Sequence, residues 1–177
     1  MTAETVLSNA RIVLDDQILS GSLLIRDGKI ADISEGTARS GEDVEGDYII
    51  PGLIELHTDH LEQHYSPRPG VRWNTTAAIQ AHDAQVATSG ITTVFDCLRM
   101  GADEDGGFEM GEMRGLADAI HAAQKEGRLR AEHLFHLRCE VSSDNVLEHF
   151  EDFKEDPYVR LVSLMDHAPG QRQFQSM

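Results

Sequence analysis

The chain has 177 residues, 40% of them hydrophobic, and its 31 acidic and 15 basic side chains give a formal net charge of −16. This acidity argues against nucleic acid as a partner, and no apolar run approaches the roughly 18 residues of a membrane span. The N-terminus lacks the basic and apolar regions of a secretory signal, and Cys97 and Cys139 show no Cys-x-x-Cys spacing. The composition therefore predicts a soluble, cytoplasmic protein with reduced, buried thiols.

The first 50 residues read as short strands. Asp27-Gly28 is a strong hairpin signal between an apolar segment, Ser22–Arg26, and the following Lys29–Ile33. Ser34–Gly46 is acidic and contains Gly and Ser, so we expect a loop there.

After Gly52, strand-like and helix-like segments alternate, which predicts a parallel sheet. Gly90 and Gly127 follow two of the helical segments and are typical helix-terminating residues. The predicted elements are, in order, strand Leu53–His57, helix Thr75–Ser89, strand Ile91–Asp96, helix Met110–Glu126, strand His133–Glu140, a short helix from Ser142 or Ser143 to about Phe153, and strand Arg160–Met165.

The first of these strands ends in residues of the types that bind metals. A Pro51-Gly52 break opens a short apolar run that ends in His57, Asp59 and Glu62. On an extended strand His57 and Asp59 point to the same side, because side chains alternate with a period of two. Imidazole and carboxylate together suit a divalent ion such as zinc, manganese or iron. The alternative is a strand end that is merely polar.

The segment from Pro51 to His57 resembles the first barrel strand of the amidohydrolase superfamily, which builds metal-dependent hydrolases on a (β/α)8 barrel, or TIM barrel. Most members end this strand in His-x-His, whereas this chain has His57-Thr58-Asp59. Further motifs are similar to one branch, the diphosphatases of phosphonate metabolism, although that branch more often has Asn at the position of His60. These motifs are His57–Glu62, Ser66–Trp73, Ala81–Ala84, Ser89–Val94, Arg130–His133, His136–Glu140 and Ser163–Phe174.

The resemblance implies an α/β fold in two parts. Residues 1–50 would form the N-terminal part of a small β-sandwich, and residues 51–177 the first four βα units of the barrel. A (β/α)8 barrel takes about 250 residues, so we expect this chain to contain only the first half of the barrel, without its C-terminal half.

In such barrels the functional residues lie at the C-terminal ends of the strands. Glu140 matches superfamily members that place a glutamate ligand at the end of the third strand, and a structural ion pair with Arg138 or a neighbouring arginine is the alternative. Asp96 is interpreted as structural or as orienting a ligand. Three further residues, Glu62, Asp166 and His167, are candidates for ligands or for groups that orient them.

A proline-rich loop after the first strand offers a phosphate-binding residue. Pro67 and Pro69 stiffen the backbone around Arg68, which lowers the entropy lost when its guanidinium is fixed. Arginine matches phosphate oxygens in bidentate geometry. Arg172, after the Pro169-Gly170 turn, is a second candidate. A solvated surface arginine is the alternative for each.

The resemblance implies metal-dependent hydrolysis of a phosphorylated ribose phosphonate, α-D-ribose 1-methylphosphonate 5-triphosphate, to the 5-phosphate and pyrophosphate. One or two divalent ions would generate the attacking hydroxide. The catalytic acid–base group is not assigned and is expected in the missing half. Two other functions stay open: a carbon–nitrogen hydrolase of the same superfamily, deacetylase-like or dihydroorotase-like, and a non-catalytic half-barrel. Assembly into a homo-oligomer is also left open.

Overall fold

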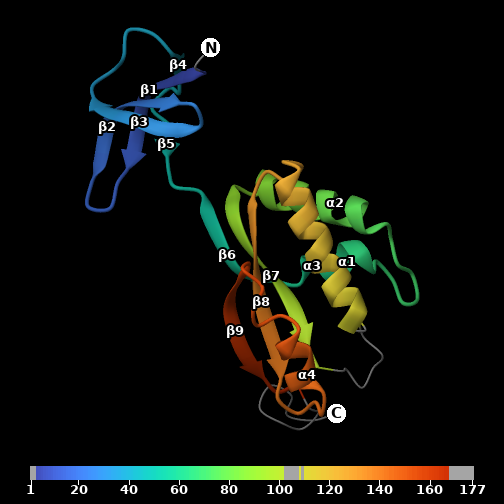
Figure 1. Ribbon diagram of the computed structural model, residues 1–177. Coiled ribbons are helices and arrows are strands. Elements are labelled where there is room, and N and C mark those ends of the chain that lie inside the picture. The colour runs from blue at the N-terminus through green and yellow to red at the C-terminus, as the bar shows by residue number, and fades with distance from the viewer. Residues whose placement is uncertain (1–2, 102–107, 109, 168–177) are drawn as a thin grey trace. The chain divides into compact units, whose positions relative to one another are not determined.

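The computed structural model describes residues 3–101, 108 and 110–167, and the chain divides into two compact units, residues 1–51 and 52–177 (Figure 1). Within the described ranges, no helix is both long enough and apolar enough to cross a membrane.

The first unit is a five-stranded sheet. Strands β1 (Glu4–Val13), β2 (Ile18–Arg26) and β3 (Lys29–Glu35) pair antiparallel, and two short strands, β4 (Glu42–Asp43) and β5 (Tyr48–Ile49), pair parallel with β1.

The turn between β2 and β3 confirms the predicted hairpin. Asp27 and Gly28 have φ of 51° and 75°, the positive values that a type I′ turn requires at both central residues. The prediction of a loop over Ser34–Gly46 is partly wrong. Its first two residues extend β3, and β4 lies within it, because the free edge of β1 offers backbone groups with which a polar segment can pair.

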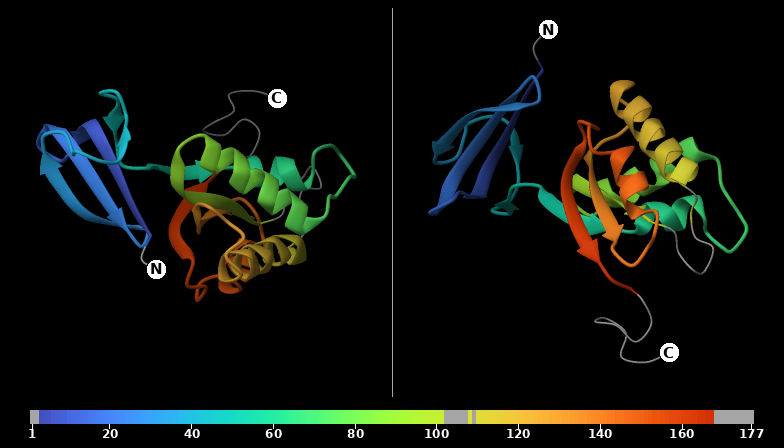
Figure 2. Two further views of the ribbon diagram at one scale, coloured as in Figure 1. Left: turned by 90° about the horizontal axis from the view of Figure 1, so that it is seen from above. Right: turned by 60° about the horizontal axis from the view of Figure 1, so that its bottom comes forward.

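The second unit has a four-stranded parallel sheet in the order β6 (Leu53–Thr58), β7 (Ile91–Met100), β8 (Glu132–Glu140) and β9 (Val159–Met165). Figure 2 shows its helices on one face of this sheet, while the other face has no helix of this unit on it. The predicted fold class, the first half of a (β/α)8 barrel preceded by a separate sheet, is confirmed. The helices are α1 (His60–Tyr65), α2 (Thr75–Thr88), α3 (Met110–Lys125) and α4 (Val146–Glu151).

The core of this unit lies between the sheet and the helices. Phe135, Leu137 and Cys139 alternate along β8 and are at most 4% exposed, whereas His136 and Arg138 between them point to the helix-free face. The fully buried residues Ile79 of α2 and Leu116 of α3 belong to the same core.

Local sequence explains the boundaries of the elements. Asn74 caps α2 by accepting a hydrogen bond from the amide of Ala77 at 3.0 Å, and Gly90 has the left-handed φ of 78° that ends this segment. Gly52 lies so close to Thr92 that a Cβ would stand 2.2 Å from the Thr92 side chain, so only glycine fits where β6 begins.

The structure differs from the prediction at three elements. β7 continues to Met100, four residues past Asp96, so Asp96 does not end its strand. α1 was not predicted, because its six residues are too few to show helical periodicity. α4 begins at Val146 after the N-cap residue Asn145, not after Ser142 or Ser143, because Ser143 donates instead to the Asn145 side-chain oxygen at 2.6 Å.

Candidate metal centre

A register shift at the end of β6 directs His57 to the helix-free face. Glu55 pairs with Val94 and Thr58 with Asp96, so two residues, Leu56 and His57, lie opposite the single residue between Val94 and Asp96. An extra residue of this kind locally redirects side chains and is common beside active sites. The geometry explains how His57 joins a cluster with residues of β7 and β8.

That cluster, the inner-face cluster, consists of His57, Cys97 and His136. Its ligand atoms all lie within 4.8 Å of one another, and Nδ1 of His57 is 3.2 Å from Nδ1 of His136. Cys97 and His136 are register partners in β7 and β8, so their side chains leave the sheet on the same face. Nε2 of His136 bonds to Oγ of Ser163 on β9 at 2.8 Å.

Asp59 lies against this cluster, at the N-cap of α1. Its Oδ2 is 3.5 Å from Nε2 of His57, which brings the two residues together as the sequence predicted. Its Oδ1 accepts from Nη1 of Arg138 at 2.9 Å. Arg138 thus pairs directly with Asp59, and Glu140 acts on it as a nearby charge that helps to raise the Arg138 pKa.

Burial and charge set the protonation of the cluster. Burial raises the pKa of the Cys97 thiol to about 12, against the opposing effect of the Arg138 guanidinium. Burial, and then the neighbouring His57, lowers the pKa of His136. Burial disfavours the charge on Arg138, yet Cys97, Asp59 and Glu62 hold its pKa above the usual value. Cys97 is therefore a thiol and His136 a neutral imidazole at neutral pH.

Glu140 belongs to a different contact. It accepts from the backbone amide of His167 at 3.2 Å and also pairs with the His167 ring. It lies four residues beyond His136 on β8, about 13 Å along an extended strand. The structure thus brings Glu140 and His167 together, but not with His57 and Asp59. Asp166 follows the end of β9 and is half-buried.

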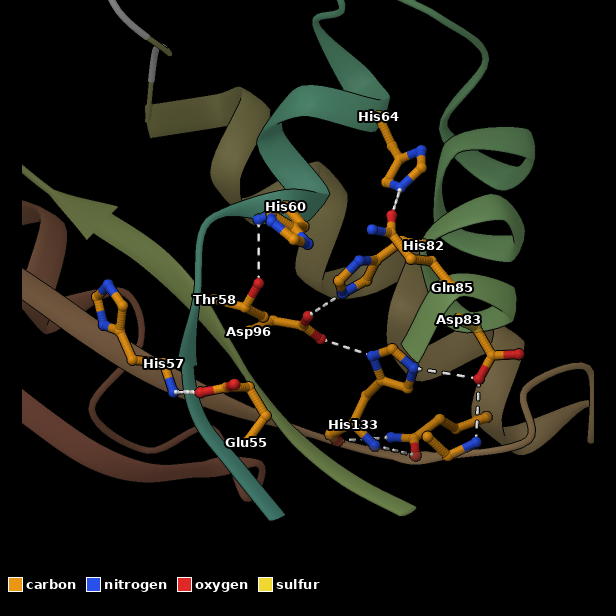
Figure 3. Close-up of polar contacts among 12 residues, drawn as sticks. Glu55, His57, Thr58, His60, His64, His82, Asp83, Gln85, Asp96 and His133 are labelled. Atoms are coloured by element: carbon orange, nitrogen blue, oxygen red, sulfur yellow. Dashed lines mark hydrogen bonds and ion pairs between the residues drawn. The ribbon is translucent and has the colours of Figure 1, made fainter. Parts of the chain in front are cut away.

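A second polar cluster lies on the opposite, helix-covered face and consists of His82, Asp83, Asp96 and His133 (Figure 3). We call it the buried network, since none of its side chains is more than 1% exposed. Asp96 binds Nε2 of His82 at 2.7 Å and Nδ1 of His133 at 2.6 Å. Figure 3 shows His57 on the far side of β6, pointing away from these residues.

The protonation of the buried network follows from its contacts. Nδ1 of His82 has no hydrogen-bond partner in the described part of the chain, so His82 contributes to the network only through the hydrogen bond from Nε2 to Asp96. Oδ1 of Asp83 accepts from the amides of Arg130 and Ala131 at 2.9 and 3.0 Å and faces Nε2 of His133 at 3.4 Å. His133 therefore donates from both ring nitrogens, as an imidazolium between two carboxylates.

The pKa shifts agree with this assignment. Burial opposes the charged form of Asp96, but the hydrogen bonds from His133 and His82 hold its pKa below the usual value. Burial likewise opposes the charge on His133, and its bonds to Asp96 and Asp83 raise its pKa above the usual value. The atoms of His82, Asp96 and His133 are close enough to suggest a metal site. However, two zinc ligands lie about 3.3 Å apart, and the 2.6 and 2.7 Å contacts are shorter hydrogen bonds.

The predicted phosphate-binding loop is anchored to the rest of the unit through Arg72 but not through Arg68. Arg68 is exposed and forms a tight turn with Val71, with no described side chain bonded to its guanidinium. Arg72 instead anchors the loop to α3, donating to Glu112 at 2.6 and 3.3 Å and to Ser66 at 2.8 Å. Arg172 lies outside the described residues.

Sequence reasoning missed Cys97 and His136 as site residues. The period of two along β8 correctly predicted that His133 and His136 lie on opposite faces, but it did not say which face holds the site. Cys97 lies in the part of β7 that was predicted to follow the strand, so it had no predicted neighbours.

Comparisons with solved structures identify the fold. The chain matches a D-hydantoinase with a TM-score of 0.55 and 25% identity, over 99% of this chain and 35% of that one. It matches a triazine hydrolase variant with a TM-score of 0.52 and 17% identity, over 91% of this chain and 46% of that one. The chain therefore has the fold of the N-terminal half of an amidohydrolase-superfamily barrel, with the preceding sheet.

A particular enzyme resembles this chain along nearly all of its length. The α-D-ribose 1-methylphosphonate 5-triphosphate diphosphatase of Escherichia coli strain K12 is 44% identical over 171 residues, which cover 96% of this chain and 45% of the relative. A D-hydantoinase of Rhizobium radiobacter is 30% identical over 152 residues, covering 84% of this chain and 30% of the relative. The chain thus spans less than half of these curated relatives. No family model matches it.

Proposed function

We propose that this chain is the metal-binding half of a hydrolase that converts α-D-ribose 1-methylphosphonate 5-triphosphate to the 5-phosphate and pyrophosphate. The main support is the 44% identity to the diphosphatase of Escherichia coli over 96% of this chain. The matched region is long enough to include the end of β6 and the strands that bear Cys97 and His136. The substrate is a small, phosphorylated ribose phosphonate, and a cytoplasmic location remains a prediction from composition.

The proposed metal site is built around His57 and Asp59 at the end of β6. The donors fit a divalent ion, because imidazole and carboxylate suit zinc, manganese or iron, and Arg138 fixes Asp59 through the 2.9 Å contact. When bound, such an ion lowers the pKa of a coordinated water toward neutrality. Glu140, Glu62, Asp166 and His167 remain predicted contributors at or near the same edge of the sheet.

Arginines are proposed to hold the triphosphate. Arg68 is exposed on a turn that is stiffened by Pro67 and Pro69, and its fork can bind two phosphate oxygens. Arg172 is the second predicted phosphate ligand. Arg138 is not proposed for this role, because it is 7% exposed in its side chain and is bound to Asp59.

A carbon–nitrogen hydrolase is the second candidate. The observation in its favour is the D-hydantoinase structure, which this chain matches with a TM-score of 0.55 at 25% identity. The greater sequence identity to the diphosphatase favours phosphoanhydride hydrolysis.

The proposal can be tested with a chimeric protein. In it, residues 1–177 are fused to the part of the Escherichia coli diphosphatase that follows the matched region. With a divalent ion present, we expect this chimera to release pyrophosphate from the triphosphate, as followed by phosphorus NMR, and to leave hydantoin intact. His57→Ala in the same chimera is the control for metal-dependent turnover. A folded, metal-loaded chimera that hydrolyses hydantoin but not the triphosphate would contradict the proposal.

A further inference from the structure

Three neighbouring strands of the barrel sheet bring two imidazoles and a thiol to one point. His57 comes from the end of β6, Cys97 from the middle of β7 and His136 from β8. Cys97 and His136 are 1% and 4% exposed, whereas the side chain of His57 is 38% exposed. Two of the three donor residues are therefore buried, and the third is accessible to solvent.

Nδ1 of His136 is 3.2 Å from both the Leu56 carbonyl oxygen and Nδ1 of His57, so its lone pair becomes available to a metal ion when the proton of His136 lies on Nε2. Its Nε2 is 2.8 Å from Oγ of Ser163, and a proton on Nε2 donates to that oxygen. Nδ1 then faces Nδ1 of His57 at 3.2 Å, close to the separation of about 3.3 Å expected for two nitrogens on one tetrahedral zinc. A metal-bound histidine commonly donates its other ring N–H to a fixed partner in this way.

His57 shows the same arrangement with a carboxylate. Nε2 of His57 is 3.5 Å from Oδ2 of Asp59, and the other oxygen of Asp59 is held by Arg138 at 2.9 Å. Asp59 therefore lies on the ring nitrogen that points away from His136. This arrangement matches the carboxylate–histidine–metal triads in which the carboxylate orients the ring instead of binding the ion.

We propose that Cys97 and His136, together with Nδ1 of His57, bind a divalent transition-metal ion such as zinc. On binding, the S–H bond of Cys97 breaks, its proton passes to solvent and a sulfur–metal bond forms. Because the side chain of His57 is partly exposed, water can reach an ion bound there. This ligand set rests on the proposed function, because it specifies the metal site of that hydrolase. It replaces the role of Asp59 as a metal donor, proposed above, with a role in orienting the His57 ring.

Cobalt provides a direct test, because a thiolate bound to Co²⁺ gives a near-ultraviolet charge-transfer absorption that nitrogen and oxygen ligands do not give. The 177-residue chain, whether monomer or assembly, is titrated with Co²⁺. We expect one thiolate band that Cys97→Ser abolishes and Cys139→Ser retains. Cys139 is a matched control, because it is the only other cysteine and is also buried, on the helix-covered face. His136→Gln should weaken Co²⁺ binding at least tenfold.

X-ray absorption of the zinc-loaded Cys139→Ser chain provides a second measurement that does not require Cys97→Ser to fold. A sulfur at about 2.3 Å with nitrogen neighbours supports the ligand set. Cobalt binding without a thiolate band, or a zinc shell without sulfur, overturns the ligand set and leaves the proposed hydrolase activity standing. A chain that binds neither ion also overturns it, whereas the proposed activity fails only in the pyrophosphate assay of the chimera.

Discussion

The buried network makes a strong prediction about stability, because Asp96 holds two histidines where no water reaches. Asp96→Asn keeps the shape of the side chain but removes the charge that faces the His133 imidazolium. The substitution weakens the contacts of 2.7 and 2.6 Å, and a hydrogen bond to a charged group contributes about 1.5–3 kcal/mol. Two such bonds give a loss of about 3–6 kcal/mol, which overlaps the range of about 3–5 kcal/mol found when one partner of a buried pair is removed.

The assay is urea unfolding followed by circular dichroism at pH 6. Total stabilities are typically about 5–15 kcal/mol, so the predicted loss should shift the midpoint strongly. Glu132→Gln is the matched control, since it makes the same acid-to-amide change at an exposed residue next to His133 on β8, and it should cost less than about 0.5 kcal/mol. A loss below about 1 kcal/mol for Asp96→Asn would refute the assignment of a buried imidazolium.

The pH dependence tests the same assignment with a definite sign. The folded-state pKa of His133 is raised through its contacts with Asp96 and Asp83, and Arg130 and His82 are the other titratable groups near it. A raised histidine pKa contributes stability that is fully present below the unfolded value of about 6.5 and is lost as the pH rises through the folded value. The stability difference between the wild type and Asp96→Asn should therefore shrink from pH 6 toward alkaline pH. A stability difference that grows with pH would contradict the assignment of His133 as a buried imidazolium.

The remaining predictions concern the site and the assembly of the sheet. His57→Ala should abolish metal binding measured by elemental analysis, whereas Asp59→Ala should lower affinity by about 10–100-fold, because Asp59 orients the ring; equal and complete loss in both variants would instead make Asp59 a ligand. In the chimera, Arg68→Ala should raise KM for the triphosphate without changing metal content, and Arg68→Lys should rescue it only in part, because an ammonium cannot form the bidentate contact; an unchanged KM would remove Arg68 from the site. Residues 1–177 alone should be inactive and should associate or expose apolar surface, because Leu164 of β9 is 76% exposed and Ile54 of β6 is 63% exposed; a compact monomer in light scattering that releases pyrophosphate would show the reverse.

The sequence predicted the order and type of most elements because their periods were clear. Strand β8 and helix α2 lie within one residue of their predicted bounds. β7 was predicted too short because a carboxylate, Asp96, was taken for a strand end. The better signal was Gly101, which directly follows the true end of the strand at Met100 and has a positive φ of 110°.

The site was harder to predict because both faces of a barrel strand are buried. The alternating pattern of β8 predicts that His133 and His136 point to opposite faces of the sheet. Only the register between β7 and β8 shows that His136 shares its face with Cys97, and His133 shares the other face with Asp96. The pairing of Glu140 with His167 joins residues 27 apart in sequence, and nothing in either motif specified it. Long-range contacts of this kind depend on tertiary packing, which local pattern does not encode.

The two clusters are connected through the strands that bear them. Asp96 and Cys97 are neighbours on β7 and point to opposite faces, and their register partners on β8 are Phe135 and His136. A shift of β7 against β8 would therefore break the bonds of Asp96 to His133 and also separate Cys97 from His136. Because the charged bonds of the buried network resist that shift, its residues hold the metal donors in position without touching them. Asp96→Asn should thus weaken Co²⁺ binding as well as stability, even in the fraction of the protein that remains folded.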